Sequence, residues 1–328
     1  MAEAPDFFDR LCGITEAYLT RRRKKARIRK EKQRAKSQVV DWIEAILWAV
    51  CMVLLINQYL IQAFEIPSGS MMDTLMIGDR IFVNKLIYGP ELLPGAGKLP
   101  SPYSPRRNEV IIFENPSYIS RGAVFDIAQR IIFMATFSLV NIDRDENGEP
   151  SVHFLIKRAA GAEGDHFVSE RGEMKIRFAG EEDWILERDY NAALGLDHRI
   201  SRLVEDSSYP ALEAAGRLGA YLDLALNPPE SLSARTDSLY GLRYPDYFAT
   251  EDARLEMLRS AFPQDTRYRA RLARQRLGWY VPEGYVFPLG DNRDNSRDGR
   301  YFGPVKKSRV LGRGALIFWP LSRLGAIR

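Results

Sequence analysis

The chain has 328 residues, of which 45% are hydrophobic and 27% are charged, and its formal net charge is +4. This length leaves room for a membrane anchor with one large or two small domains, and it supplies enough apolar material for a core. The two cysteines, Cys12 and Cys51, exclude a disulfide framework and a zinc-ligand cluster from the part of the chain that follows residue 51.

The first 36 residues combine an amphipathic stretch with a strongly basic run. Residues 1–20 mix apolar and charged side chains, which is typical of a short helix on a membrane face or of an ordinary leading helix. Residues 21–36 contain eleven basic residues and a single acidic one, Glu31. Such a run could bind nucleic acid. Its position directly before an apolar segment favours a cytoplasmic flank, so residues 1–36 are predicted to be cytoplasmic and to bind no nucleic acid.

An uncharged stretch of twenty residues follows from Ala45 to Phe64. A helix of about 20 apolar residues crosses the hydrocarbon core of a bilayer. Because this stretch is longer than the apolar core of a cleavable signal peptide, residues 37–64 are predicted to form a retained, single-pass anchor. The basic flank places the N-terminus inside the cell and the chain after Glu65 outside.

The rest of the chain alternates between strand patterns and one long helical stretch. Apolar residues alternate or cluster as in buried strands at residues 78–89, 109–114, 153–158, 167–185, 279–289 and 315–319. Residues 186–276 carry alanine, leucine and arginine at helical spacing, interrupted by prolines. We therefore expect a β domain made of residues 65–185 and 277–328, with a partly helical insertion at 186–276. The apolar run within residues 115–150 is consistent with an interfacial helix or hairpin and also with an added core element.

The stretch from Ile66 to Leu75 holds a candidate nucleophile. Pro67 and Gly69 favour a sharp turn that presents Ser70 after a strand. A serine hydroxyl attacks a carbonyl only when a base removes its proton, and no histidine lies near. Without such a base the stretch is a polar turn after a membrane anchor.

Lys157 is the predicted base. A lysine accepts a proton only when it is neutral, and burial against apolar surface lowers its pKa. Leu155 and Ile156 precede it in a strand pattern that would supply such surroundings. A lone lysine at a strand end is otherwise an ordinary solvated group.

The Asp/Asn-rich stretch at residues 291–298 resembles a calcium loop only superficially. When an EF-hand pattern is started at Asp294, Val305 occupies the position that requires a bidentate glutamate. A turn held by Asx hydrogen bonds and an arginine–carboxylate pair is the better interpretation, and it could direct Ser296 toward an active site. The sequence predicts no metal and no cofactor.

Taken together, these stretches resemble the bacterial type I signal peptidases, a family of membrane-anchored Ser-Lys proteases. Four blocks match in the expected order: IPSGSMMDTL, GDRIFVNKLIYG, LIKRAAGAEGD and GDNRDNSRDGRYFG. The resemblance covers residues 37–169 and 278–323. It implies a mainly β protein: an N-terminal transmembrane helix followed by an antiparallel β catalytic domain, whose apolar surface rests on the membrane.

The resemblance also implies a role for each matching residue. Ser70 would be the nucleophile and Lys157 its general base, and Ser68 would contribute a hydroxyl to the oxyanion hole beside the Ser70 backbone N–H. Ser296 would hydrogen-bond the lysine. The supporting residues of its loop would be Asp298, Arg300 and Asp291, and the residues lining shallow apolar substrate pockets would be Phe64, Ile66, Leu75 and Ile156.

The implied partners are exported preproteins that carry signal peptides, together with membrane lipid, at the bacterial inner membrane. The implied catalytic domain is extracytoplasmic, and the resemblance leaves the oligomeric state open. Two positions depart from the family pattern: Asp73 stands where proline is usual, and Gly299 stands where serine is usual.

Two other functions are compatible with parts of the pattern. The first is a non-catalytic, membrane-anchored binding or scaffold protein that keeps the fold. The second is a soluble, self-cleaving Ser-Lys repressor, which the predicted anchor and the lack of a DNA-binding helix pair ahead of the β domain disfavour.

Overall fold

The computed structural model describes residues 7–34, 38–92, 97–136, 139–144, 148–196, 200–239 and 245–327. The chain divides into two compact units, residues 1–53 and residues 54–328. The first unit contains helix α1 (Phe7–Arg34) and most of helix α2 (Gln38–Tyr59). Among the described residues, α2 is the helix that is long and apolar enough to cross a membrane.

The ends of both N-terminal helices differ from the prediction. The leading helix α1 continues through most of the basic run, to Arg34, since lysine and arginine are good helix formers. Conversely, α2 ends at Tyr59, and Ile61–Glu65 form strand β1, so the predicted anchor 37–64 is too long at its end. Apolar composition alone does not distinguish a helix end from a buried strand, and here pairing of Ile61–Glu65 with Arg80–Asn84 selects the strand.

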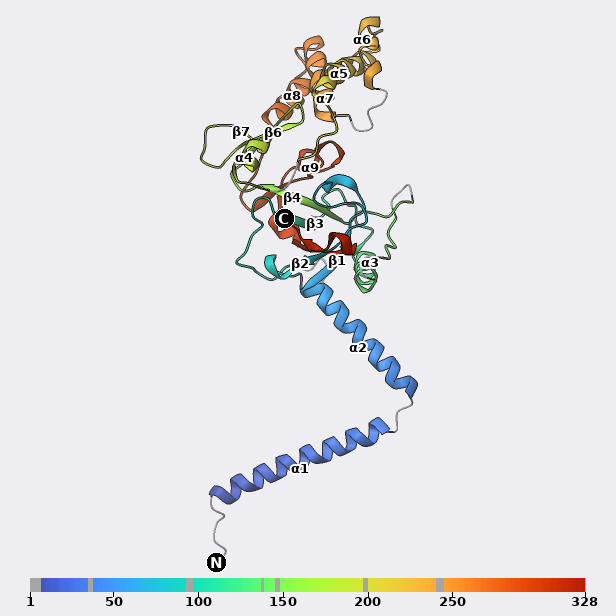
Figure 1. Ribbon diagram of the computed structural model, residues 1–328, viewed down its shortest axis with the longest axis vertical. Helices are drawn as coiled ribbons and strands as arrows, with labels where there is room; N and C mark the ends of the chain where they lie inside the picture. Colours follow the sequence, from blue (N-terminus) through green and yellow to red (C-terminus); the bar gives the residue numbers. More distant parts are fainter. Residues whose placement is uncertain are drawn as a thin grey trace, which may run out of the picture. The chain divides into compact units, whose positions relative to one another are not determined.

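The larger sheet of the second unit is antiparallel. Lys157 lies in one of its strands, and Ser70 lies shortly after another. The order of this sheet is β1-β2-β11-β3-β4-β9-β10, with β12 paired to β11. These strands are β1, β2 (Arg80–Asn84), β3 (Val110–Glu114), β4 (Phe154–Gly161), β9 (Tyr285–Leu289), β10 (Val305–Lys306), β11 (Val310–Trp319) and β12 (Gly325–Ala326). Figure 1 shows that strands from both ends of the second unit's sequence, blue and red, lie together in this sheet.

A smaller antiparallel sheet follows β4 in the chain. Its order is β7-β6-β5-β8, formed by β5 (His166–Glu170), β6 (Glu173–Arg177), β7 (Ile185–Leu186) and β8 (Trp279–Tyr280). The turns predicted at residues 171–172 and 180 are confirmed by the positive φ angles of Arg171, Gly172 and Gly180. The antiparallel β domain is therefore confirmed.

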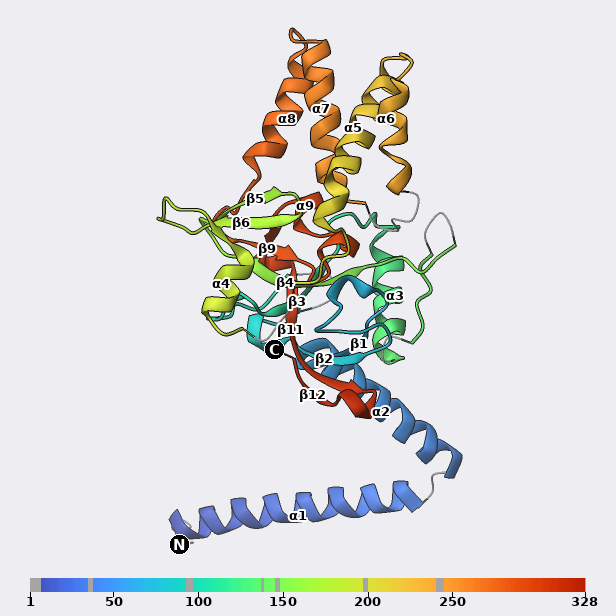
Figure 2. The same ribbon diagram turned by 45° about the horizontal axis from the view of Figure 1, so that its top comes forward.

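The protein is only partly "mainly β", because helices make up much of the second unit as well. They are α3 (Ala123–Ala135), α4 (Glu187–Ala193), α5 (Tyr209–Asp223), α6 (Glu230–Ala234), α7 (Tyr247–Ala261), α8 (Thr266–Leu277) and α9 (Gly299–Phe302). Figure 2 shows α5–α8 gathered on the side of the sheets away from β1 and β2. Helices α5 and α7 pack closely, because a Cβ added at Gly216 would lie 2.1 Å from the Thr250 carbonyl oxygen.

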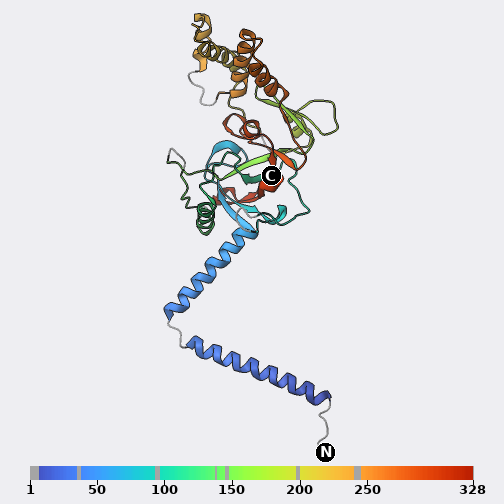
Figure 3. The ribbon, with the colours of Figure 1, turned by 180° about the vertical axis from the view of Figure 1, so that it is seen from behind.

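Helix α3 accounts for the apolar run whose structure the sequence left open. It is a surface helix that packs partly against the core through Phe133. Val124, Ile127 and Ile131 are exposed on its outer side, whereas Gln129 is buried and Arg130 forms ion pairs with neighbouring carboxylates. Helix α3 therefore carries apolar side chains on its outer side as well as on the side that packs against the core, unlike an ordinary surface helix. In the view from behind, α3 lies beside β1 (Figure 3).

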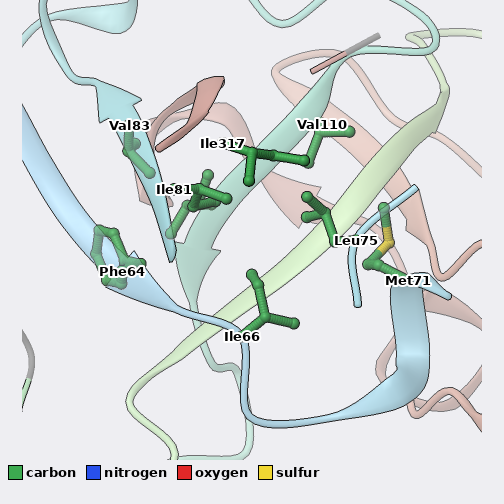
Figure 4. Packing of buried hydrophobic residues seen from close by; sticks show 9 residues of the cluster. Phe64, Ile66, Met71, Leu75, Ile81, Val83, Val110 and Ile317 are labelled. Atoms are coloured by element: carbon green, nitrogen blue, oxygen red, sulfur yellow. The ribbon is translucent and has the colours of Figure 1, made fainter. Parts of the chain in front are cut away.

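One apolar cluster fills the space between β1, β2 and the serine stretch. Figure 4 shows that Phe64, Ile66, Met71 and Leu75 converge with side chains of β2, β3 and β11. Burying side chains of this kind contributes about 1.5–3 kcal/mol each. The cluster therefore fixes the serine stretch against the sheet on both sides of Ser70.

Candidate active site

Ser70 and Lys157 meet at the end of β1. The chain leaves β1 at Glu65 and forms a one-turn helix at Gly69–Met71, which carries the serine. Lys157 lies in the middle of β4, where its backbone pairs with Ile111 of β3. The Lys157 Nζ and the Ser70 Oγ are 2.7 Å apart. Both residues are buried, with exposed fractions of 3% and 7%.

The surroundings of Lys157 favour its neutral form. Burial lowers the pKa of the Lys157 ammonium from 10.5 to about 8, although the nearby Asp298 and Asp291 carboxylates act in the opposite direction. Its Nζ has one further hydrogen-bond acceptor, the Ile156 carbonyl oxygen at 3.0 Å. A substantial fraction of this lysine is therefore neutral near pH 8 and can accept the proton of the serine hydroxyl.

Ser68 lies on the same turn, and its hydroxyl donates to the Ser70 Oγ at 3.4 Å. Three residues after the serine, Asp73 adopts a φ of 78°, which belongs to the left-handed region. Proline, whose φ is fixed near −65°, could not adopt that conformation. The departure at Asp73 therefore corresponds to a turn that a proline-containing sequence would build differently.

Residues 290–300, here called the supporting loop, lie against the serine turn. The Asn292 backbone N–H donates to the Ser70 carbonyl oxygen at 3.1 Å. The Asn292 side-chain amide donates to the Gly69 carbonyl oxygen at 3.2 Å. The two acceptors belong to the peptide groups before and after the Ser70 Cα. Holding both peptide groups fixes the direction of the serine side chain.

Asp291 connects the supporting loop to β4 through a buried ion pair. Its carboxylate accepts two hydrogen bonds from the Arg158 guanidinium, at 2.9 and 2.7 Å, and one from the Thr74 hydroxyl at 2.6 Å. These partners lower the pKa of the Asp291 carboxyl against the opposing effect of burial. Arg158 follows Lys157 directly, and Thr74 lies in the turn after Ser70. Through these two residues, Asp291 connects the strand of the lysine to the turn of the serine.

Asp298 and Arg300 form a second buried pair within the supporting loop. The Asp298 carboxylate accepts from the Arg300 Nε at 2.9 Å and from the Gly290 backbone N–H at 2.9 Å. Glycine at position 299 suits this packing, because an added Cβ would lie 2.7 Å from the Pro288 carbonyl oxygen. The second departure from the family pattern therefore has a steric reason in this chain.

The predicted hydrogen bond from Ser296 to the lysine is not formed. The Ser296 Oγ is buried and has no hydrogen-bond partner among the described residues, and Lys157 Nζ bonds to Ser70 and Ile156 instead. Ser296 lies close to the serine turn all the same, because a Cβ added at Gly290 would touch both the Ser296 hydroxyl and the Ser70 carbonyl oxygen. Ser296 thus lies near the serine turn without the contact to Lys157 that the resemblance implied.

The four residues predicted to line substrate pockets lie together beside Ser70. Phe64, Ile66 and Leu75 are buried members of one cluster, and Ile156 packs against it while half-buried. Leu75 has no exposed surface, and Phe64 and Ile66 are also buried, so in this structure these three side chains belong to the core beneath the serine turn. Ile156 directly precedes Lys157 in the chain, and Ile66 lies shortly before Ser70.

Sequence reasoning missed Arg158, Thr74 and Asn292, which hold the serine turn and the supporting loop together. Arg158 could have been found, because it directly follows Lys157 in an apolar strand pattern and therefore faces the opposite side of the sheet. An arginine stays charged when it is buried, so it needs a carboxylate partner. Asn292 gave no such signal, since its contacts are with backbone atoms of a distant segment.

Among the described residues, no group of three His, Cys, Asp or Glu side chains is placed to hold a metal ion. The arrangement that remains is a hydroxyl within hydrogen-bond distance of a buried amine, with a second hydroxyl alongside. That constellation is suited to acyl transfer with a serine nucleophile and a lysine base.

The chain is similar to a known protein family over most of its length, and three of its relatives carry the same name. A family model described as "Signal peptidase, peptidase S26" matches residues 39–319. Signal peptidase I of Haemophilus influenzae is 27% identical over 302 residues, which cover 89% of this chain and 74% of that protein. Signal peptidase I of Pseudomonas aeruginosa is 27% identical over 281 residues, covering 86% of this chain and 69% of that protein. Signal peptidase I of Aquifex aeolicus is 25% identical over 268 residues, with 81% and 79% covered.

Proposed function

Because the chain belongs to the signal peptidase family, peptidase S26, and is a serine endopeptidase that removes signal peptides from preproteins, we propose that Ser70 is its nucleophile and Lys157 its general base. The observation that carries this proposal is the 2.7 Å separation between the Lys157 Nζ and the Ser70 Oγ in a buried setting. Both members of the dyad are present and in contact, so the scaffold alternative has no observation in its favour.

The proposed reaction uses the neutral amine of Lys157. The amine accepts the proton of the Ser70 hydroxyl as the Oγ attacks the scissile carbonyl. The resulting oxyanion accepts hydrogen bonds from the Ser68 hydroxyl and the Ser70 backbone N–H. The protonated lysine then gives its proton to the leaving amine, which releases the mature protein. A water molecule, deprotonated by the same lysine, hydrolyses the acyl-enzyme.

The proposed supporting roles follow the contacts of the site. Asp291 holds the turn after Ser70 through Thr74 and Arg158, and Asp298 with Arg300 gives the supporting loop its shape. Ser296 stays a proposed participant through its closeness to the serine turn. The residues proposed to line the substrate pockets are Phe64, Ile66, Leu75 and Ile156. An extended substrate would dock there as an added strand.

We also propose that α2 anchors the protein in the bacterial inner membrane with a single pass. The eleven basic residues at 21–36 favour a cytoplasmic N-terminus, which places the catalytic unit outside the cytoplasm. Helix α3 supports a membrane-facing side, because its apolar side chains Val124, Ile127 and Ile131 are exposed to the surroundings. The Met134 carbonyl oxygen, in the last turn of α3, accepts a hydrogen bond from the Asn57 side chain in the last turn of α2, at 3.0 Å, so α3 ends where the anchor would leave the bilayer.

The proposal is tested by cleavage of a purified preprotein by the detergent-solubilised chain. Wild-type protein is expected to cut after a small residue at the end of the signal peptide. The Ser70→Ala and Lys157→Ala variants are expected to leave the preprotein intact while staying folded. Processing by either variant at the wild-type rate would contradict the assignment of the dyad.

A further inference from the structure

The start of the helical insertion is bonded to the supporting loop along several consecutive residues. The Ser201 backbone N–H donates to the Asp291 carbonyl oxygen at 2.9 Å, and the Ser201 carbonyl oxygen accepts from the Arg293 backbone N–H at 3.0 Å. The residue between them, Asn292, bonds to Ser70 instead. Because successive residues of an extended chain direct their backbone groups to opposite sides, the loop lies between Ser201 and the nucleophile.

Arg202 continues this attachment with its side chain. Its Nε donates to both Asp294 carboxylate oxygens, at 3.2 and 3.0 Å. The same carboxylate accepts from the backbone N–H groups of Leu203 and Val204, at 2.6 and 2.9 Å. Asp294 thus has at least three donors from residues 202–204, and the Arg202 side chain is largely buried. A charge-assisted set of this kind is stronger than neutral hydrogen bonds and fixes direction as well as distance.

Arg202 is itself held by the helices of the insertion. Its Nη2 donates to the Tyr209 hydroxyl at 2.6 Å, and that hydroxyl donates to the Asp246 carboxylate at 3.0 Å. Tyr209 is the first residue of α5 and is fully buried, and Asp246 caps the start of α7 by accepting from the Phe248 and Ala249 backbone N–H groups. The first turns of both helices are therefore connected to Asp294 through one guanidinium group.

A second buried contact joins the first helix of the insertion, α4, to the supporting loop. Glu187, at the start of α4, accepts a hydrogen bond from the Arg293 guanidinium at 2.6 Å, and both side chains are nearly fully buried. Phe248 of α7 also lies against the supporting loop, because the Arg300 guanidinium lies over its ring, 5.8 Å from the ring centroid. The insertion therefore contacts the supporting loop at Arg293 and Arg300 as well as at Asp294.

We propose that Arg202 is a positioning residue for the Ser70–Lys157 dyad, and that the helical insertion acts as a brace for the supporting loop. This inference rests on the proposed function of the dyad. The brace acts through Asp294 on the loop, and through Asn292 on the backbone of the nucleophile. On this proposal the insertion contributes to the rate of cleavage and does not serve to bind a separate ligand.

The test compares three variants of the full chain in lipid nanodiscs. Arg202→Gln keeps a polar side chain but removes the guanidinium and its charge. Arg202→Lys keeps the positive charge but cannot contact Asp294 and Tyr209 at the same time. The matched control is Arg254→Gln, which breaks an ion pair to Asp223 of 2.7 Å inside the insertion and away from the loop. The readouts are kcat and KM on a short soluble peptide that carries a cleavage site, with kcat expressed per reactive serine.

Arg202→Gln is expected to lower kcat between about tenfold and about 100-fold, because misplacing a reacting group by about 1 Å can cost about 100-fold. KM is expected to stay within about twofold, since the apolar pockets are untouched. Arg202→Lys is expected to fall between Arg202→Gln and wild type, and Arg254→Gln is expected to match wild type. A merely structural role would lower the number of reactive serines without lowering kcat per serine.

Amide hydrogen exchange supplies a readout that does not depend on activity. The Asn292 amide donates to the Ser70 carbonyl oxygen, so its exchange reports whether the loop is held against the serine. Exchange is expected to rise in Arg202→Gln and to stay unchanged in Arg254→Gln. If wild type itself cleaves nothing, the proposed function fails while the exchange result still decides the brace.

Tyr209→Phe provides a milder variant should Arg202→Gln fail to fold. It removes one hydroxyl between Arg202 and Asp246, and it is expected to raise loop exchange and lower kcat by less than Arg202→Gln does. Unchanged loop exchange together with a kcat within about twofold of wild type, in whichever of the two variants folds, would overturn the proposal.

Discussion

Replacing Lys157 with methionine is expected to stabilise the protein at neutral pH while it abolishes cleavage. Burial lowers the pKa of the Lys157 ammonium from 10.5 to about 8 in the folded state. Between about pH 8 and 10.5 the unfolded chain therefore binds more protons than the folded one, so stability rises with pH in this window. At about 1.4 kcal/mol per pKa unit, the lysine costs the folded state about 3 kcal/mol below pH 8.

Methionine has a similar length and carries no charge, so it removes that cost. It also loses the hydrogen bonds of Lys157 to Ser70 and Ile156, each worth about 1 kcal/mol. The net expectation is a gain of about 1 kcal/mol at pH 6, which becomes a loss of about 2 kcal/mol above pH 10.5, where the lysine is neutral in both states. The two stability curves should therefore cross between about pH 8 and 10.5.

Thermal unfolding of the detergent-solubilised chain at several pH values measures this crossing. A difference of 1 kcal/mol shifts Tm by about 2–4 °C in a domain of this size. Lys306→Met serves as control, because Lys306 is exposed on β10 and its replacement should give no crossing. A Lys157→Met variant that is less stable than wild type by the same amount at every pH would refute the argument from burial.

Three further outcomes are expected. The kcat/KM for a soluble peptide should rise with pH and level off above about pH 8, where Lys157 loses its proton; a profile that falls between pH 7 and 9 would contradict a lysine base. Asp291→Asn should lower the free energy of unfolding by about 3–5 kcal/mol in chemical denaturation, because it leaves the buried Arg158 charge without its carboxylate; a loss below about 1 kcal/mol would show that the pair is dispensable. Nitroxide labels at Ile127 and Ile131, in a chain without other cysteines, should be more accessible to oxygen than to a polar nickel reagent in bilayers, and water-like accessibility would exclude lipid contact of α3.

Local sequence patterns predicted the parts of the site that are local in the chain. The alternation of Ile81 and Val83 marked β2, and the apolar residues before Lys157 marked the buried strand β4. The turn before the serine could be predicted because Pro67 restricts the backbone directly, whereas Gly69 lies in the one-turn helix and does not adopt a positive φ. Composition also indicated α2, although not where it ends, since the residues after Tyr59 are as apolar as those before it.

Contacts between distant segments could not be predicted in this way. The pairing of Ser201 with the supporting loop joins residues about 90 positions apart, and nothing in either segment identifies the other. The outward apolar face of α3 was ambiguous for a related reason, because the same residues could equally have faced a core. Ser296 was misassigned because a motif gives the neighbourhood of a hydroxyl, whereas its hydrogen-bond partner depends on a side-chain rotamer set by packing around Gly290.

Trapping the acyl-enzyme tests the central claim most directly. A peptide substrate is mixed with the wild-type chain, the reaction is quenched with acid within one turnover, and the modified residue is located by mass spectrometry. The dyad predicts an acyl group on the Ser70 hydroxyl in wild type and no acyl-enzyme in Lys157→Met. An acyl group on Ser68 or Ser296, or equal acylation without Lys157, would contradict it.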